Sequence, residues 1–295
     1  MIKAPPTPKG FRDIKPELAK KRREVISKIA DVLEQEGFVP IETPTIEFAD
    51  TLKGKYGEEE KLIYEFTDRG DRKLALRYDL TVPLARYVAT YNPPLPFRRY
   101  QIGQVFRGEN PQKGRFREFT QFDFDSVGSN DPKEDALIIA AAIKSLEVLG
   151  VKNFKILIND RNIFAGLPPS IIRIIDKIKK IGRDEVVNEL IKAGYSEKEL
   201  QTIESNEPTE NLQNIFQELE NLGISKDKYQ FSPTLARGLD YYTGIILEAE
   251  IEEYGGGSVG GGGRYDNLIG MFSKKQAPAV GFSFGLDRLL EILYP

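Results

Sequence analysis

The most constraining feature of this sequence is the alternation of apolar and polar side chains from Arg117 to Val127. Successive side chains of a strand point to opposite faces of a sheet. Phe122 and Phe124 would share one face, and the other face would carry Phe119, Gln121, Asp123 and Asp125. Gln101 to Arg107 can alternate in the same way. The pattern predicts two strands of a sheet whose second face lines a polar pocket.

The loop between these strands is charged, and it can turn at several glycine and proline positions. Its charged residues are Arg107, Glu109, Lys113, Arg115 and Arg117. An arginine side chain is a planar fork that fits phosphate, so this loop has two interpretations: a nucleotide grip or a solvated hairpin tip.

The composition excludes several kinds of chemistry. The chain contains no His and no Cys, which removes imidazole acid–base catalysis, thiolate nucleophiles, disulfides and most zinc sites. Trp is also missing, and the joint absence indicates either a restricted alphabet or engineering. The net charge of −3 means that any RNA contact is local.

Length and hydropathy set the class of protein. The 295 residues suit one large domain or a domain with an insertion. No apolar run approaches the roughly 20 residues of a membrane span, and the N-terminus lacks an apolar signal core. With no Cys, a cytoplasmic location is expected.

The remaining chain reads as further helices and strands. Helices are expected from Leu18 to Leu33, after Asp79, from Pro132 to Leu149, after Gly285, and as four short helices within 167–222. Extended segments are expected at 38–44, 61–66, 73–77, 154–158, 245–251 and 279–284, the second and third forming a hairpin turned at 68–71.

Two motifs have open interpretations. Asp79 either caps the helix that follows it or binds a ligand. Residues 255–263 contain seven glycines among nine. They form either a flexible hairpin tip or a backbone brought close to a ligand, where any Cβ would intrude. The glycines alone leave both interpretations open.

Several of these segments carry a family resemblance. Arg107-Gly108-Glu109 resembles the second motif of class II aminoacyl-tRNA synthetases, and the longer run FRGENPQKGRFREFTQFDFD resembles histidyl-tRNA synthetase. ARGLDYYTG at 236–244 and GGGRYDNLIGMF at 261–272 are similar to the two histidyl-specific motifs. The second similarity favours the ligand interpretation for the C-terminal half of the glycine-rich stretch. GLDRL at 285–289 resembles the third class motif, and the helix and extended segment before residue 44 resemble the first. LRYDLTVPLARYVA looks like the archaeal and eukaryotic form.

The resemblance implies an α+β fold with a mixed, mainly antiparallel sheet flanked by helices. It divides the chain into a catalytic domain at 1–166 and 226–295, and a helical insertion at 167–225. Family members continue into an anticodon-binding domain for which no residues remain here, so this sequence is expected to be a catalytic fragment, or a natural or designed minimal form.

The resemblance also implies the substrates and the catalytic groups. Histidine and ATP would give histidyl-adenylate, and the acyl group would then pass to tRNA(His). Arg107 would hold the α-phosphate and the substrate carboxylate, Arg237 would stabilise charge on the α-phosphate, and Arg288 would take the γ-phosphate. Glu109 would accept from the adenine amino group and Phe119 would stack on the base. Mg²⁺ would bridge the phosphates, through ligands that the sequence does not name.

For histidine itself, the resemblance implies that Asp79 and Thr81 hold the α-ammonium group. The implied histidine contacts are Asp79, Leu80, Thr81, Arg107, Gln121, Asp125, Arg237, Tyr241 and Tyr242. Gln112, Lys113 and Arg115 would approach the tRNA acceptor end, and a homodimer is expected.

The main alternative is a binding module of the same family. Histidyl-synthetase paralogues without the anticodon domain act as histidine-sensing regulatory subunits of ATP phosphoribosyltransferase. A regulatory kinase pseudo-synthetase domain is a further alternative. The residues Arg107, Glu109, Arg237 and Arg288 favour the ligase, because a sensor has no need of ATP-binding arginines.

Overall fold

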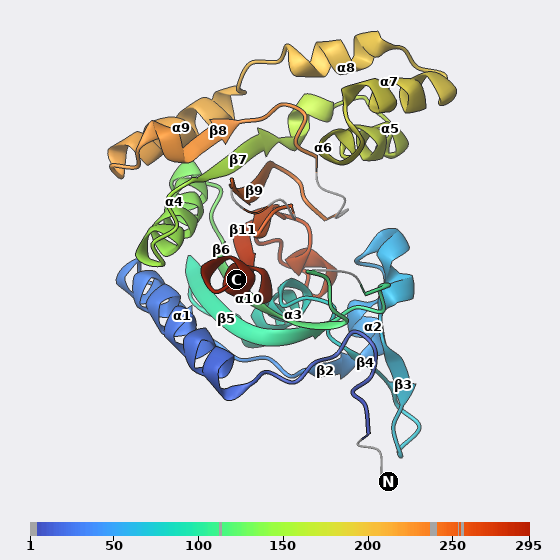
Figure 1. Cartoon of the computed structure of the whole chain (residues 1–295), viewed down its shortest axis with the longest axis vertical. Helices are drawn as coiled ribbons and strands as arrows, with labels where there is room; N and C mark the ends of the chain where they lie inside the picture. The colour runs from blue at the N-terminus through green and yellow to red at the C-terminus, as the bar shows by residue number, and fades with distance from the viewer. Residues whose placement is uncertain (1–4, 112–113, 237–240, 253, 255–256) are drawn as a thin grey trace.

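An eight-stranded sheet organises the computed structural model, which describes residues 5–111, 114–236, 241–252, 254 and 257–295 (Figure 1). The strand order is β1-β5-β6-β11-β10-β9-β7-β8. The two edge pairs, β1 with β5 and β7 with β8, are parallel, and the pairs between them are antiparallel. The strands are β1 (Val39–Pro40), β5 (Phe97–Phe106), β6 (Glu118–Val127), β7 (Phe154–Asp160), β8 (Tyr229–Phe231), β9 (Ile245–Ile251), β10 (Gly260–Arg264) and β11 (Ala279–Gly285). The predicted α+β class with a mainly antiparallel, mixed sheet is confirmed.

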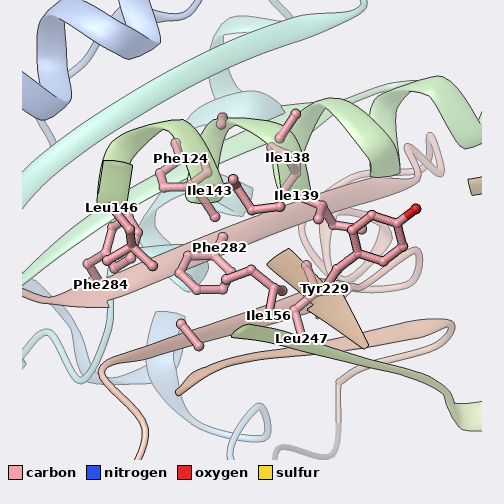
Figure 2. Close-up of a cluster of buried hydrophobic side chains, with 14 of the residues drawn as sticks. Phe124, Ile138, Ile139, Ile143, Leu146, Ile156, Tyr229, Leu247, Phe282 and Phe284 are labelled. Carbon is pink, nitrogen blue, oxygen red and sulfur yellow. The ribbon is translucent and has the colours of Figure 1, made fainter. Parts of the chain in front are cut away.

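One face of this sheet is covered by α1 (Pro16–Gln35), α4 (Pro132–Val148), α9 (Glu210–Asn221) and α10 (Leu286–Leu293). Helix α4 begins at Pro132, and Asp131 caps it. The Asp131 side chain accepts a hydrogen bond from the Lys133 backbone N–H at 3.0 Å. Phe124, Phe282 and Phe284 pack beneath α4 in the main core (Figure 2). The apolar face predicted for the 117–127 strand is therefore the face that forms this core.

The N-terminal third also builds a smaller unit beside the main sheet. A three-stranded antiparallel sheet has the order β2-β4-β3, and its hairpin turns at the predicted residues 68–71. Its elements are β2 (Ile46–Phe48), α2 (Ala49–Leu52), the 3₁₀ helix η1 (Gly57–Leu62), β3 (Glu65–Thr67), β4 (Lys73–Leu76) and α3 (Thr81–Tyr91). Of the strand predicted at 61–66, only residues 65–66 are in β3; residues 61–62 end the 3₁₀ helix and 63–64 connect it to the strand. Most of 38–44 is extended without sheet partners.

The segment after β7 forms five helices, one more than predicted. They are α5 (Pro169–Ile175), α6 (Ile178–Ile181), α7 (Arg183–Lys192), α8 (Glu197–Glu204) and α9. The extra break falls at Asp176–Lys177, where no glycine or proline marks it. Helices α5, α7 and α8 share a small apolar cluster of their own, whereas Leu212, Ile215 and Leu219 of α9 join the main core. The boundaries 167 and 225 stay a prediction, and this packing favours an earlier end for the insertion.

Short 3₁₀ turns complete the chain: η2 (Arg161–Phe164), η3 (Lys226–Lys228) and η4 (Ile269–Met271). Within the described ranges, no helix has the length and apolar character needed to cross a membrane.

Candidate active site

A cavity of about 420 Å³ opens on the polar face of the large sheet. Its floor comes from β6, β10 and β11, and its walls come from the start of α3, the loop after β5, the residues before β9 and the start of α10. Segments far apart in the sequence therefore meet around one space. Arg107 and Arg288, Asp79 and Thr81, and Tyr241 and Tyr242 all line it.

The floor is free of side chains where two glycine-rich strands cross it. Gly260, Gly261 and Gly262 belong to β10 and line the cavity together with Gly281 of β11. A Cβ on Gly260 would lie 2.7 Å from the carbonyl oxygen of Ser283, and one on Gly281 would lie 1.9 Å from Oδ1 of Asp125. Glycine is thus required by close backbone and side-chain approach. Residues 260–264 are a paired strand rather than a hairpin tip; Gly255 and Gly256 lie outside the described residues.

Strand β6 brings the predicted polar side chains to this floor. Gln121, Asp123 and Asp125 line the cavity, while Phe122 and Phe124 are fully buried in the core behind it. The alternation read from the sequence is confirmed residue by residue.

Asp125 sits at the centre of a buried ionic contact. Its Oδ2 lies 2.7 Å from Nη2 of Arg99, a fully buried residue of β5, and its Oδ1 accepts from the hydroxyl of Tyr265. Burial raises the pKa of the Asp125 carboxyl, and Arg99 and the Tyr265 hydrogen bond oppose that rise. The pairing holds the carboxylate in place at the cavity wall.

Asp79 combines both of the interpretations given to it. Its Oδ1 accepts from the Val82 backbone N–H at 3.0 Å, which stabilises the first turn of α3, and from the Tyr56 hydroxyl at 2.9 Å. Its Oδ2 is buried with no hydrogen-bond partner in the described structure, and the residue lines the cavity. One oxygen caps the helix and the other is available to a ligand.

Thr81 lines the cavity beside Asp79, but Leu80 does not. The Leu80 side chain is fully buried, and its carbonyl oxygen lies 3.5 Å from Nη2 of Arg99. Of the residues implied to contact histidine, Leu80 is therefore placed behind the wall rather than on it.

Two of the three predicted arginines reach the cavity. The Arg107 Nε donates to the carbonyl oxygen of Tyr78 at 3.2 Å, and its guanidinium lies over the rings of Tyr78 (4.3 Å) and Phe119 (5.0 Å). Arg288 donates from Nη1 to the carbonyl of Ser258 at 2.7 Å and from Nε to that of Gly114 at 3.3 Å. Both guanidinium groups are oriented by backbone and ring contacts. Arg237, the third, lies outside the described residues.

The predicted adenine contacts, Glu109 and Phe119, also line the cavity. One carboxylate oxygen of Glu109 is 3.6 Å from Nη1 of Arg115, which is itself half-exposed at the rim. Of the residues implied to approach tRNA, Gln112 and Lys113 lie outside the described residues, and Arg115 alone is placed here.

Tyr241 and Tyr242 form an aromatic wall with ring centroids 4.9 Å apart. Burial raises the pKa of Tyr241 well above its ordinary value, so its hydroxyl stays protonated at neutral pH. Tyr241 also contacts Tyr265, with centroids 6.0 Å apart. The tyrosine wall thus connects to the Asp125 contact on the floor.

Several cavity residues had no role in the sequence interpretation. Tyr265 lies within the recognised GGGRYDNL run, and Asp123 lies on the recognised polar face, so a signal for each was present. Glu59, Phe116 and Ser283 also line the cavity. Glu59, which accepts from the Tyr78 hydroxyl, stands in an acidic run whose pattern does not distinguish one member from another.

Among the described residues, no group of three or more acidic side chains is placed to hold a metal ion. Mg²⁺ commonly binds through one or two carboxylates and the phosphates of its nucleotide. The described residues therefore offer no preformed metal cage.

The chain matches known proteins over nearly all of its length. The family model described as histidyl-tRNA synthetase matches residues 10–172 and 165–289. The histidine–tRNA ligase of Aeropyrum pernix is 42% identical over 97% of this chain and 74% of the relative. That of Nanoarchaeum equitans is 45% identical over 97% of this chain and 73% of the relative.

Solved structures show the same similarity. Histidyl-tRNA synthetase from Nostoc sp. PCC 7120 aligns with a TM-score of 0.85 at 30% identity, covering 98% of this chain and 75% of that one. A protein from Bacillus halodurans C, described as an ATP phosphoribosyltransferase regulatory subunit/histidyl-tRNA synthetase, aligns with a TM-score of 0.83 at 26% identity, covering 98% and 83%. The chain spans about three quarters of the length of its curated relatives. It belongs to the histidyl-tRNA synthetase family.

Proposed function

We propose that this chain activates L-histidine with ATP to histidyl-adenylate and pyrophosphate, and then transfers the histidyl group to tRNA(His). The observation that carries the proposal is the meeting of Arg107 and Arg288 in one cavity with the carboxylates of Asp79 and Asp125. The guanidinium groups suit a triphosphate, and the carboxylates suit an amino acid that carries N–H donors.

The chemistry needs no protein nucleophile. The substrate carboxylate attacks the α-phosphorus, the bond to the leaving pyrophosphate breaks, and catalysis comes from positioning and charge neutralisation. Arg107 would neutralise the reacting carboxylate and α-phosphate, and Arg288 would hold the γ-phosphate. Arg237 keeps its proposed role at the α-phosphate. These roles fit a chain without His or Cys.

The adenine and the amino acid would occupy opposite parts of the cavity. Glu109 would accept from the adenine amino group, and Phe119, whose ring already contacts Arg107, would pack on the base. Asp79 and Thr81 would hold the α-ammonium group, while Gln121, Asp125, Tyr241 and Tyr242 would meet the imidazole. A pocket built from such polar groups rejects analogues that leave them unpaired, by about 10⁴ to 10⁵.

We propose that Mg²⁺ enters with ATP. It would neutralise charge on the outgoing phosphates, and the binding mode in which nucleotide phosphates supply most of its ligands needs no dedicated protein cage. The chain's own residues then supply the orientation of the two substrates.

Two partners extend the proposal. Arg115 at the cavity rim, with Gln112 and Lys113, would contact the tRNA acceptor end, so charging should weaken with salt while adenylate formation should not. A homodimer is supported by exposed apolar side chains on and beside β1 and β2, where Val39, Ile46 and Phe48 are 48%, 45% and 59% exposed. Light scattering after size exclusion tests the dimer.

We also propose a cytoplasmic location for the chain.

Histidine-dependent exchange of pyrophosphate into ATP tests the function directly. We expect exchange with L-histidine and none without it. The second candidate is a histidine-sensing regulatory subunit, favoured by the similarity to the Bacillus halodurans protein. Histidine binding without exchange would support that candidate and contradict the ligase.

A further inference from the structure

Asp123 is a buried residue of the cavity lining for which the proposed mechanism has no use. It stands on β6 between Gln121 and Asp125, on the same face of the sheet, and it lines the cavity. The residue is only 2% exposed. A carboxyl group so deeply buried is costly unless it meets donors or charge.

The protein supplies hydrogen-bond donors to only part of the Asp123 carboxyl group. Its Oδ1 is buried with no hydrogen-bond partner among the described residues, although the hydroxyl of Ser283 hydrogen-bonds to the carboxyl group. The other buried cavity atoms in the same state include Asp79 Oδ2 and Gln121 Oε1. All three are acceptors. A ligand that fills this space must bring N–H or O–H donors.

The charges around Asp123 are also unbalanced. Arg99 attracts both Asp123 and Asp125, and its 2.7 Å ion pair is with Asp125. The buried guanidinium of Arg77 also acts on Asp123, but its hydrogen bonds go to the carbonyl oxygens of Thr43 and Gln104. The Nε and Nη1 of Arg99 make no hydrogen bond in the described structure, so the guanidinium does not close the gap through them. The charged and titratable groups that act on Asp123 are Arg77, Asp79, Arg99, Asp125 and Tyr265. The neighbouring strand β11 contributes the hydroxyl of Ser283. An extra proton at this position would relieve the imbalance.

We propose that Asp123 is a further specificity residue of the histidine site, and that its carboxyl group and the substrate's imidazole hold one proton between them in a direct hydrogen bond. This inference rests on the proposed function. Asp123 stands between Gln121 and Asp125, the side chains proposed to meet the imidazole, and would therefore lie beside the ring. An amide or hydroxyl side chain of another amino acid could not share a proton in this way.

The proton balance follows from the ordinary ionisation of each partner. Burial raises the pKa of Asp123 to about 7, against the attraction of Arg99. The imidazole of histidine has an ordinary pKa of about 6.5. Above both values the carboxyl is ionised and the free imidazole is neutral, with a single N–H. Donation from one ring nitrogen to Asp125 and from the other to Asp123 needs a second N–H, so binding takes up one proton from solvent. Below both values each is protonated, and binding releases one.

Calorimetric titration of the full chain with L-histidine, in buffers of different ionisation enthalpy, measures this exchange of protons. We expect uptake of about one proton at pH 8.5 and release of about one at pH 5.5, with affinity highest between them. This measurement needs no variant. Histidine binding without a change of sign across this range would overturn the inference.

The Asp123→Asn variant separates a specificity role from a structural one. Asn keeps the shape of the side chain but does not titrate, so we expect no proton uptake at pH 8.5. The KM for histidine in pyrophosphate exchange should rise by about tenfold or more, and the KM for ATP should stay within about twofold. Glu252→Gln, which removes an exposed carboxylate beside β9, is the matched control and should change neither.

The outcomes distinguish this inference from the function on which it rests. If exchange is normal and Asp123→Asn leaves the KM for histidine unchanged, the role of Asp123 is wrong and the ligase stands. An equal rise in both KM values would indicate a structural role and would also overturn the inference. Absence of both histidine binding and exchange would overturn the inference and the proposed function together.

Discussion

Two buried ionic clusters on the large sheet differ in how completely their charges are paired. The cluster of Arg99, Asp123 and Asp125 lies under the cavity and leaves acceptor atoms without partners. The cluster of Arg264 and Asp135 lies outside the cavity lining. In the second cluster, Arg264 donates to both carboxylate oxygens of Asp135, at 3.1 and 2.8 Å.

The second cluster is closed on every side. The Nη1 of Arg264 also contacts the Ser129 carbonyl at 3.1 Å and Asp266 at 3.3 Å, and Asp266 accepts from the Thr243 hydroxyl at 2.8 Å. This chain of contacts anchors the segment that carries the cavity tyrosines to the start of α4. Of these two clusters in the described part of the chain, the one with unsatisfied buried charge lies at the cavity, where a ligand can satisfy it, and the satisfied one supports the scaffold.

The largest effect is expected on pyrophosphate exchange, from substitution of a cavity arginine. Replacing Arg107 with Ala removes a guanidinium that donates only to the Tyr78 carbonyl in the hydrogen bonds of the described structure. We expect histidine-dependent pyrophosphate exchange to fall by about 10³-fold, because a preorganised donor to developing charge is lost. The melting temperature should change little, and circular dichroism checks it. Near-normal exchange in a folded Arg107→Ala protein would contradict the role given to this residue.

Substitution in the Arg264–Asp135 cluster should lower the free energy of unfolding. Arg264→Leu leaves the Asp135 carboxylate buried and unpaired, and we expect a loss of about 3 to 5 kcal/mol in the free energy of unfolding, measured in urea. The double variant Arg264→Leu with Asp135→Leu should recover part of that loss, because no unpaired charge remains. If the single variant costs less than about 1 kcal/mol, the cluster does not support the scaffold as described.

The pH dependence of stability should separate the two clusters further. The pKa of Asp123 is raised to about 7 and that of Asp135 to about 6, in both cases mainly by burial, from an ordinary 3.8. A carboxyl whose folded pKa is raised stabilises the fold fully below its ordinary pKa, and this contribution is lost as the pH rises through the folded value. Stability from these two groups should therefore fall between about pH 4 and 7.

Asp123→Asn should make the fall shallower between about pH 4 and 6, where Asp135 still contributes, and should remove it between about pH 6 and 7, where of these two groups only Asp123 contributes. Urea unfolding at half-unit steps from pH 4 to 8 measures it, with the Glu252→Gln variant as a control that should follow the original curve. An unchanged slope between pH 6 and 7 in Asp123→Asn would contradict the raised pKa of Asp123.

The smallest effect is expected at the surface contacts of the insertion. Lys179 of α6 pairs with Glu248 at 3.1 Å and Glu250 at 2.5 Å, and Arg173 of α5 pairs with Glu58 at 2.9 Å. These are exposed ion pairs, which typically contribute 0 to about 1 kcal/mol. The Lys179→Ala variant should lower the free energy of unfolding by less than about 1 kcal/mol, and the difference should vanish in 0.5 M salt. A difference that persists at high salt would show that packing, not charge, holds α6 in place.

The sequence predicts best where local pattern and tertiary structure agree. The alternation in β6 and the proline and acidic cap of α4 each favour one conformation over a short range, and the structure has those elements. Asp79 shows why two readings of one residue need not exclude each other, because its two oxygens have different surroundings.

The remaining features depend on contacts that short-range pattern does not encode. No residue at Asp176–Lys177 signals the break between α5 and α6, and the assignment of α9 to the main core follows from its packing on α4. The pairing of Arg99 with Asp125 joins neighbouring strands in register, which became apparent only once the partners of each strand were known. The unpaired state of Asp123 is likewise a property of the assembled site.

A crystal structure of the chain with L-histidine and a non-hydrolysable ATP analogue would test the central claim most directly. We predict both ligands in the one cavity, with the phosphates against Arg107 and Arg288 and the imidazole within hydrogen-bond distance of Asp123 and Asp125. Histidine in this cavity with the nucleotide bound elsewhere, or Arg107 and Arg288 facing away from the phosphates, would contradict it.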